Sequence, residues 1–287
     1  LAETVYSRFD LRAYRDLDVL VAPAAFPDAL RALEAAGASL YERNWTLLRA
    51  GMKGQLHLTL PHGSFCDLHW HLLHDREVRG VYRLPSATLL GGVRRLVLGG
   101  VNVPSLDPVD AFVHLAVHAC LAGADRLVWL KDVDEIVQRM PPEWEGVVEK
   151  ARAAGAGLAV AAVLELVRRV LGTPAPSGVV AALDPAGGWT RMIALAARIA
   201  PPQMATGDGS ILRIVARSTR PTLGGSMTEL AARSLSLAHH PRSSSLQGRM
   251  ALRNPSRSTS ALYPSGGARE RRAYLDAVTA HDEDATY

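Results

Sequence analysis

The residues best suited to chemistry are three carboxylates on two strand-like segments. Asp16 and Asp18 open the apolar segment 16–21, and Asp67 lies within the segment 65–70. Side chains alternate between the two faces of a β-strand, so Asp16 and Asp18 point the same way. If the two strands are neighbours, three like charges converge and need a positive partner. Mg²⁺ prefers oxygen ligands, so the pattern predicts a metal site suited to phosphoryl or nucleotidyl transfer; charge at a sheet edge is the alternative.

The histidines beside Asp67 allow a second kind of metal site. Asp67, His69 and His71 occupy alternate positions of one segment and therefore share a strand face. Such a set is also compatible with zinc. We favour His69 as a donor to a substrate phosphate, and a hydrogen bond within the sheet would explain it equally well.

Two other spaced pairs do not predict metal sites. His114 and His118 have the i, i+4 spacing of a zinc-protease helix, but Leu115 stands where that chemistry requires a glutamate. We expect these histidines to pack toward the sheet. Asp132 and Asp134 lie in a helical pattern, where residues two apart point about 200° apart, so they cannot share one ion.

The segments around the acids predict a small mixed sheet with a helix against it. Pro27 and Gly37 bracket an amphipathic helix, and Leu1–Phe9 is expected to be helical as well. Further strands and a short hairpin are expected, with turns rich in Gly and Pro between them. These strand segments are Ser39–Arg49, Gln55–Leu60 and Ser64–Leu72, with the hairpin at 93–103.

The chain changes character at Asp107-Pro108, an N-cap acid followed by proline at the first helical position. From there to about Gly172 the pattern is helical, which predicts a bundle. The expected helices cover 108–121, 126–139, 142–154, 157–171 and 188–199. The fold class is therefore α+β, a sheet domain followed by helices.

Three consecutive parts are expected: a sheet domain at 1–103, a helical domain at 104–200, and a basic, partly disordered tail at 201–287. The formal net charge is +4, and the whole surplus lies in the third part. Many Ser, Gly and Pro residues accompany the arginines there, which is typical of a flexible segment.

Composition indicates an ordinary globular chain, with 48% hydrophobic and 21% charged residues. Cys66 and Cys120 lie among apolar residues, which favours buried, reduced thiols in a cytoplasmic protein. The most apolar stretch, Gly157–Val167, is too short to cross a bilayer, so no membrane partner is expected.

One ordered set of residues resembles a known family. The set is Arg12, then Asp16-Leu17-Asp18-Val19-Leu20-Val21, Asp67-Leu68-His69-Trp70, His114 and His118, and Arg126-Leu127-Val128-Trp129-Leu130-Lys131-Asp132. It is similar to the bacterial family of uncharacterised nucleotidyltransferases, within the superfamily related to DNA polymerase β, over roughly residues 1–170.

The resemblance implies a mechanism and roles for its residues. Asp16 and Asp18 would bind two Mg²⁺ ions, with Mn²⁺ as an alternative. Asp67 would bind one of them and serve as the catalytic residue by taking the acceptor proton. Arg12 and Arg15 would contact the triphosphate of ATP or another NTP, and Asp132 would be structural.

The sequence departs from this family at one place. The small-residue turn that cradles the triphosphate upstream of the acid pair does not precede Asp16. Since the sequence opens on Leu1, we expect it to be a fragment cut just after that turn. His62-Gly63-Ser64 is not a substitute, because it lies between two strands and predicts a hairpin turn.

The function expected from these patterns is transfer of a nucleoside monophosphate from an NTP to an acceptor hydroxyl of a small molecule or peptide. A metal-dependent phosphohydrolase or kinase-like enzyme is one alternative. A non-catalytic binding module that uses the basic tail is another, and nucleic acid is expected as a partner only through that tail.

Overall fold

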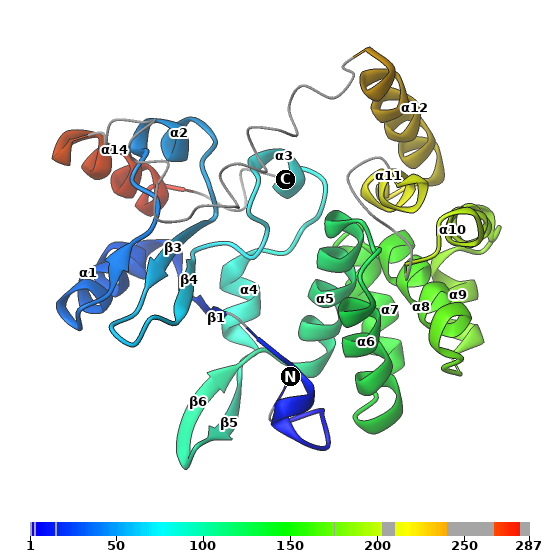
Figure 1. Ribbon diagram of the computed structural model, residues 1–287, viewed down its shortest axis with the longest axis horizontal. Coiled ribbons are helices and arrows are strands. Elements are labelled where there is room, and N and C mark those ends of the chain that lie inside the picture. The colour runs from blue at the N-terminus through cyan, green and yellow to red at the C-terminus, as the bar shows by residue number, and fades with distance from the viewer. Residues whose placement is uncertain are drawn as a thin grey trace. The chain divides into compact units, whose positions relative to one another are not determined.

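The computed structural model describes residues 2, 4–14, 16–174, 176–202, 210–239 and 267–281. The chain forms two compact units, most of whose elements are labelled in Figure 1. The sheet unit comprises Tyr14–Gly80, Leu84–Gly92 and Arg242–Tyr287; the helical unit comprises Leu1–Ala13, Val81–Arg83 and Val93–Pro241. The predicted α+β class is confirmed.

The sheet unit is built on four strands in the order β1-β4-β3-β2. Their bounds are β1 (Asp16–Leu20), β2 (Ser39–Leu40), β3 (Gln55–Thr59) and β4 (Phe65–His69). β1 runs parallel to β4, while β4 with β3 and β3 with β2 are antiparallel pairs, so the predicted mixed sheet is present. The helices of this unit are η2 (Pro23–Ala25), α1 (Phe26–Ala35), α2 (Trp45–Ala50), α3 (Arg76–Arg79), α4 (Ser86–Gly91) and α14 (Ala268–Thr279).

The two faces of this sheet differ because apolar and polar residues alternate along β3 and β4. Leu56, Leu58, Cys66 and Leu68 are buried on one face. They form one core with residues of α1, α2 and α14. The opposite face carries the residues between them, including Asp67, and is therefore the face on which polar chemistry can take place.

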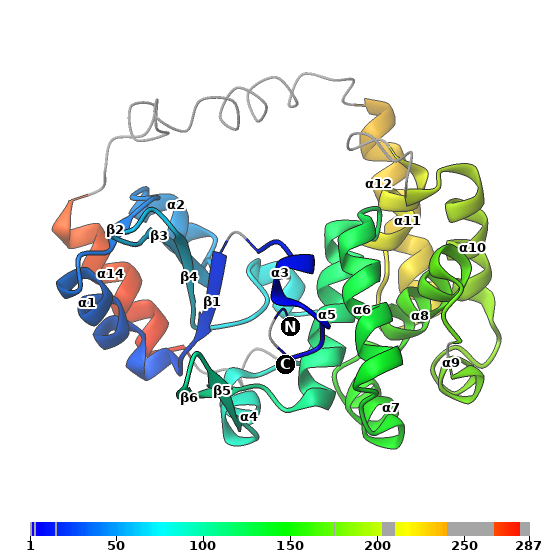
Figure 2. The same ribbon diagram turned by 60° about the horizontal axis from the view of Figure 1, so that its bottom comes forward.

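Helix α14 belongs to the core of the sheet unit although it lies far along the chain. Figure 2 shows it beside α1, and the two helices are in contact. The buried Tyr274 ring packs at 6.4 Å from the ring of Phe26 and at 5.9 Å from that of Trp45. Its hydroxyl donates to the carbonyl of Lys53 at 2.7 Å and lies 3.2 Å from the indole nitrogen of Trp70.

These helices correct the expectation of a basic tail over 201–287. That segment contains α11 (Ile211–Arg217), α12 (Leu223–His239) and α14. In α14, Tyr274 and Val278 are buried at i, i+4 spacing, so one face of an otherwise charged helix packs into the core. The part of the expected tail at 240–266 lies outside the described residues.

Two other predicted elements are wrong. The expected strand Ser39–Arg49 is extended only at β2, and α2 begins at Trp45, where the side chain of Asn44 accepts a hydrogen bond from Leu47 N at 3.2 Å. Within the described part of Leu1–Phe9 there are turns and bends in place of a helix, followed by the 3₁₀ helix η1 (Phe9–Leu11).

The helical unit contains the predicted bundle. Its other elements are β5 (Arg94–Leu98), β6 (Val101–Ser105), α5 (Pro108–Ala122), α6 (Leu127–Arg139), α7 (Trp144–Ala153), α8 (Gly157–Leu171), α9 (Ser177–Leu183) and α10 (Gly188–Ile199). Helix α8 is central: it contacts α5, α6, α7, α9 and α10, and every residue from Leu158 to Leu164 is buried.

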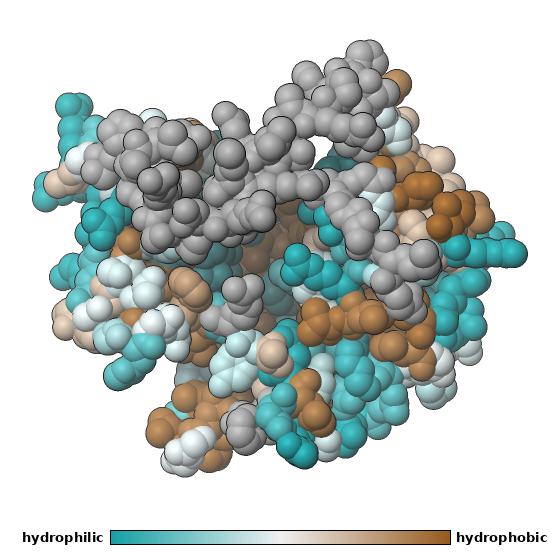
Figure 3. All heavy atoms as spheres, viewed as in Figure 1, coloured by the Kyte–Doolittle hydropathy of each residue, from teal (hydrophilic) through white to brown (hydrophobic). Residues whose placement is uncertain are grey.

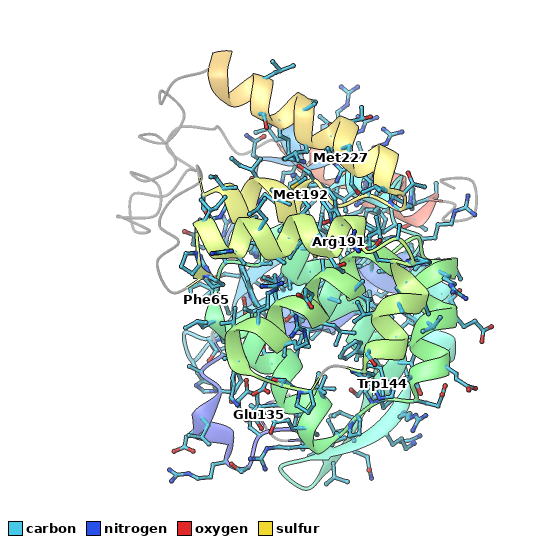
Figure 4. All side chains as sticks on the ribbon, turned by 90° about the vertical axis from the view of Figure 1, so that its right-hand side faces the viewer. Phe65, Glu135, Trp144, Arg191, Met192 and Met227 are labelled. Atoms are coloured by element: carbon cyan, nitrogen blue, oxygen red, sulfur yellow. The ribbon has the colours of Figure 1, made fainter. Side chains whose placement is uncertain are left out.

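The surface of the helical unit shows where apolar side chains remain exposed. Val97 and Val101 are exposed beside the turn of the β5–β6 hairpin, where Figure 3 shows hydrophobic residues in brown. Trp144, labelled in Figure 4 on α7, is half-buried and packs edge-on at 5.4 Å from the ring of Phe112. Among the described residues, no helix combines the length and apolar character that a bilayer crossing requires.

Candidate metal site

The strand register brings two of the three predicted carboxylates together. Asp18 on β1 pairs with Asp67 on β4, so these residues occupy the same level of neighbouring strands. In a parallel pair, residues at one level project from the same face. Asp67 is buried, whereas 67% of the Asp18 side chain is exposed, so the two carboxylates meet at the boundary between protein and solvent.

His69 joins the two acids from the same face. Its Nε2 lies 2.9 Å from Oδ1 of Asp18, and its side chain is buried. Potential ligand atoms of Asp18, Asp67 and His69 all lie within 4.8 Å of one another. Asp16 lies two residues before Asp18 and opposite Phe65, on the same face but outside this cluster.

Asp67 is held by two side chains of β3. Nδ1 of His57 lies 2.6 Å from Oδ1 of Asp67, and Nε2 of Gln55 donates to Oδ2 at 3.1 Å. The hydrogen bond to Asp67 raises the pKa of His57, although burial of the ring opposes this. Both carboxylate oxygens of Asp67 therefore have fixed directions before any ligand binds.

Sequence reasoning missed His57 and Gln55 as neighbours of the acid. Both lie on β3 at alternate positions, in the polar-apolar pattern Gln55-Leu56-His57-Leu58-Thr59. The hairpin register places His57 directly opposite Asp67. The alternation and the tight turn before β4 would have indicated that these polar side chains share the face of Asp67.

The loop that follows β4 adds further ionisable groups. His74 has a pKa lowered to about 4, because burial and then the charge of Lys53 disfavour its protonated form. Lys53 also forms an ion pair with Asp75 at 2.5 Å and lowers the pKa of that carboxyl against the opposing effect of burial. The predicted candidate His71 points elsewhere: its Nδ1 accepts a hydrogen bond from Leu73 N at 3.0 Å.

The fully buried Arg79 secures this loop. Its guanidinium donates to the carbonyl oxygens of Leu73 at 2.9 Å and of Met52 at 2.5 Å. The same group lies 4.7 Å from the centre of the Trp70 ring. The segment that follows the strand of Asp67 and His69 is thus tied to the core by charge-assisted hydrogen bonds and a cation–π contact.

Of the two arginines predicted to bind nucleotide, the structure describes only Arg12. Arg12 pairs with the buried Asp132 through Nε at 2.7 Å and a second guanidinium nitrogen at 2.9 Å, and Tyr6 donates to the same carboxylate at 2.6 Å. Asp132 thus accepts a bidentate ion pair within the helical unit, in keeping with its expected structural role. Arg15 lies outside the described residues.

The donor set suits a divalent cation. Two carboxylates at one level of a sheet repel each other, and the imidazole against each of them supplies a partial compensation. A cation between Asp18 and Asp67 would remove that repulsion more fully, and the exposed side of Asp18 leaves room for water or phosphate oxygens.

A small mixed sheet that presents carboxylates on one open face is the arrangement expected of a nucleotidyltransferase. The family model described as "Uncharacterised nucleotidyltransferase" matches residues 1–172, so the chain belongs to that family. The match includes the six strands found among the described residues and extends to the end of α8. No curated protein and no solved structure gives a significant match to the chain.

Proposed function

We propose that this chain is a divalent-cation-dependent nucleotidyltransferase that transfers a nucleoside monophosphate from an NTP to an acceptor hydroxyl. The observation that supports this most directly is the pairing of Asp18 with Asp67 on parallel strands, with the buried His69 in the same cluster. Membership in a nucleotidyltransferase family supplies the reaction class.

The proposed metal ligands are Asp16, Asp18 and Asp67, and the proposed ions are two Mg²⁺, with Mn²⁺ as the alternative. When bound, such ions neutralise the charge that develops on the phosphates and lower the pKa of the acceptor hydroxyl. Asp18 and Asp67 form the inner pair, and Asp16 extends the acidic face along β1.

The protein residues around Asp67 provide orientation and a route for a proton. His57 and Gln55 fix both oxygens of Asp67, so its remaining lone pairs point in defined directions. Asp67 is the proposed acceptor of the hydroxyl proton, which neutralises its carboxylate, and the contact with His57 at 2.6 Å keeps the group oriented. His69 contacts Asp18 through Nε2 at 2.9 Å and is proposed to border the nucleotide phosphates.

The test combines ligand binding with product analysis. Asp18→Asn and Asp67→Asn keep the shape of each side chain and remove its charge, so the affinity for Mn²⁺ should fall about tenfold or more. Asp28→Asn is the matched control, because Asp28 is an exposed acid on α1 of the same unit. Calorimetric titration with Mn²⁺ measures the affinity.

The products decide between reaction classes. Nucleotidyl transfer releases pyrophosphate and leaves the acceptor carrying a nucleoside monophosphate. Release of inorganic phosphate alone would assign a phosphohydrolase, and an acceptor that gains only one phosphoryl group would assign a kinase-like enzyme. Wild-type Mn²⁺ affinity and wild-type transfer in Asp67→Asn would contradict the proposed site.

A further inference from the structure

Two aromatic side chains remain exposed on the face of the sheet that carries the acids. Tyr41 is 44% exposed and Phe65 is 40% exposed. Their ring centres lie 6.3 Å apart with an interplanar angle of 88°, an edge-to-face pair. Such a pair leaves ring surface open to solvent on the side away from the sheet.

The strand register places this pair beside the candidate metal ligands. Phe65 is the first residue of β4 and pairs with Asp16 on β1. It lies two residues before Asp67 and therefore projects from the same face. Tyr41 continues the pairing of β2 with β3, because its N–H donates to the carbonyl of His57 at 2.9 Å. The aromatic pair thus borders the acids along one edge of the polar face.

Most of the other described aromatic side chains of the sheet unit are buried. Phe26, Trp45, Trp70 and Tyr274 are all buried in the core on the opposite face. Tyr14, which precedes β1, is exposed as well. The described part of the sheet unit therefore leaves a contacting aromatic pair in solvent next to its charged residues. Single exposed apolar residues are common, but a pair beside a polar site is a feature of ligand sites.

We propose that Tyr41 and Phe65 form the subsite that stacks the base of the nucleotide. The inference rests on the proposed function, because it takes the cation between Asp18 and Asp67 as the anchor of the triphosphate. A nucleotide held there by its phosphates can extend its sugar and base along the sheet, where the aromatic pair supplies an apolar platform. Stacking uses the π-face that every base has, so this subsite selects nucleotides over bare polyphosphate and discriminates weakly among bases.

The experiment compares a ligand that has a base with one that lacks it. Calorimetric titration with ATP and with inorganic tripolyphosphate, each with Mg²⁺, measures both affinities in the wild type, in Phe65→Thr and in Tyr41→Thr. Threonine keeps the preference for extended structure while removing the ring. Leu47→Thr is the control, since Leu47 is an exposed apolar side chain on α2.

Loss of a stacking ring should weaken ATP binding at least about fivefold and leave tripolyphosphate binding within about twofold. Leu47→Thr should change neither affinity, and circular dichroism should show the same fold in every variant. An unchanged ATP affinity in both ring variants, or an equal loss for both ligands, would overturn the stacking subsite while the proposed function stands. If the wild type binds neither ligand with Mg²⁺, the proposed function fails and the subsite fails with it.

Discussion

The imidazole of His57 and the carboxylate of Asp67 face each other across β3 and β4, with Nδ1 and Oδ1 2.6 Å apart. This contact fixes the direction of Asp67 before a cation arrives. Residues that orient a metal ligand through a hydrogen bond typically contribute tenfold to a hundredfold in affinity or activity. We therefore expect His57→Gln to weaken Mn²⁺ binding about tenfold, measured by the electron paramagnetic resonance signal of free Mn²⁺.

The control for that variant is His62→Gln, since His62 is an exposed histidine in the turn that joins the same two strands. Thermal unfolding of both variants reports whether the sheet is intact. Equal Mn²⁺ affinity in His57→Gln and the wild type would mean that Asp67 does not depend on this neighbour.

Asp16 provides a second prediction, because its carboxylate lies outside the cluster formed by Asp18, Asp67 and His69. Asp16→Asn should weaken the tightest Mn²⁺ site less than Asp18→Asn does. We expect the Mn²⁺ affinity of Asp16→Asn to be about tenfold higher than that of Asp18→Asn. Titration of the two variants under the same conditions provides the comparison. A larger loss in Asp16→Asn would show that the tight site is formed around Asp16 instead.

The contacts of Asp132 lead to a prediction about stability. Its buried carboxylate accepts hydrogen bonds from both Arg12 and Tyr6, and burial together with this acceptor raises the pKa of Tyr6. Removing one partner of a buried ion pair costs on the order of 3 kcal/mol, so Asp132→Asn should lower the free energy of unfolding by about that amount. Tyr6→Phe should cost only about 1 kcal/mol. Urea unfolding measures both.

A further substitution tests which of two roles Arg12 has, the ion pair with Asp132 or a contact with the triphosphate. Lysine cannot reproduce the bidentate geometry, so Arg12→Lys should lower stability if the ion pair with Asp132 is its main task. A variant with wild-type stability and weakened ATP affinity would instead support the expected contact with the triphosphate.

Helix α14 leads to a prediction that the C-terminal part of the chain contributes to the stability of the sheet unit. Tyr274 is fully buried and contacts Phe26 and Trp45, so Tyr274→Ala should destabilise the sheet unit by about 3 to 5 kcal/mol. Tyr274→Phe keeps the ring and loses only the hydroxyl contacts with Lys53 and Trp70, so it should cost about 1 kcal/mol. A chain that ends before α14 and unfolds at the wild-type midpoint would contradict the predicted contribution of α14 to stability.

His74 predicts a pH dependence of stability. Its folded pKa of about 4 lies below its ordinary value of 6.5, because burial and Lys53 oppose protonation; Asp75 partly offsets this pKa decrease, and His57 and His69 add to it. The unfolded chain therefore takes up a proton first as the pH falls. The stabilising contribution of neutral His74 is complete above about pH 6.5 and is lost as the pH falls toward 4. Because 37% of the side chain is exposed, solvent screening reduces its size.

The measurement for His74 is a difference between two chains. Asn cannot be protonated, so the stability of His74→Asn should fall less steeply than that of the wild type between pH 6.5 and 4. Urea unfolding at several pH values gives both curves. Parallel curves would show that His74 is not kept neutral by folding.

The parts of the fold that follow from local signals were predictable from the sequence. The Asp107-Pro108 start of α5 and the Gly residues after α5 and α8 gave helix limits within a few residues of those observed. β3 and β4 were likewise indicated by alternation and by the turn between them. Each of these elements is specified by residues close together in the chain.

Long-range packing accounts for what was missed. α14 is rich in charged residues, and only Tyr274, Leu275 and Val278 form its apolar stripe. Its partners Phe26 and Trp45 lie more than two hundred residues earlier, so no local pattern pairs them. Long-range pairing also limited the prediction of the site. Asp18 and Asp67 were expected to meet, but the contacts of Asp67 with His57 and Gln55 depend on the register of three strands.

The position of α14 affects how the protein is made on the ribosome. The sheet starts at Asp16, but the helix that covers its apolar face with α1 and α2 is synthesised only after residue 267. Domains fold during synthesis as their last element emerges, and contacts of long sequence separation form late. We expect the helical unit, which ends at Pro241, to fold first. Until α14 emerges, the nascent chain displays Leu56 and Leu58 without their full cover, and chaperones would protect it during that interval.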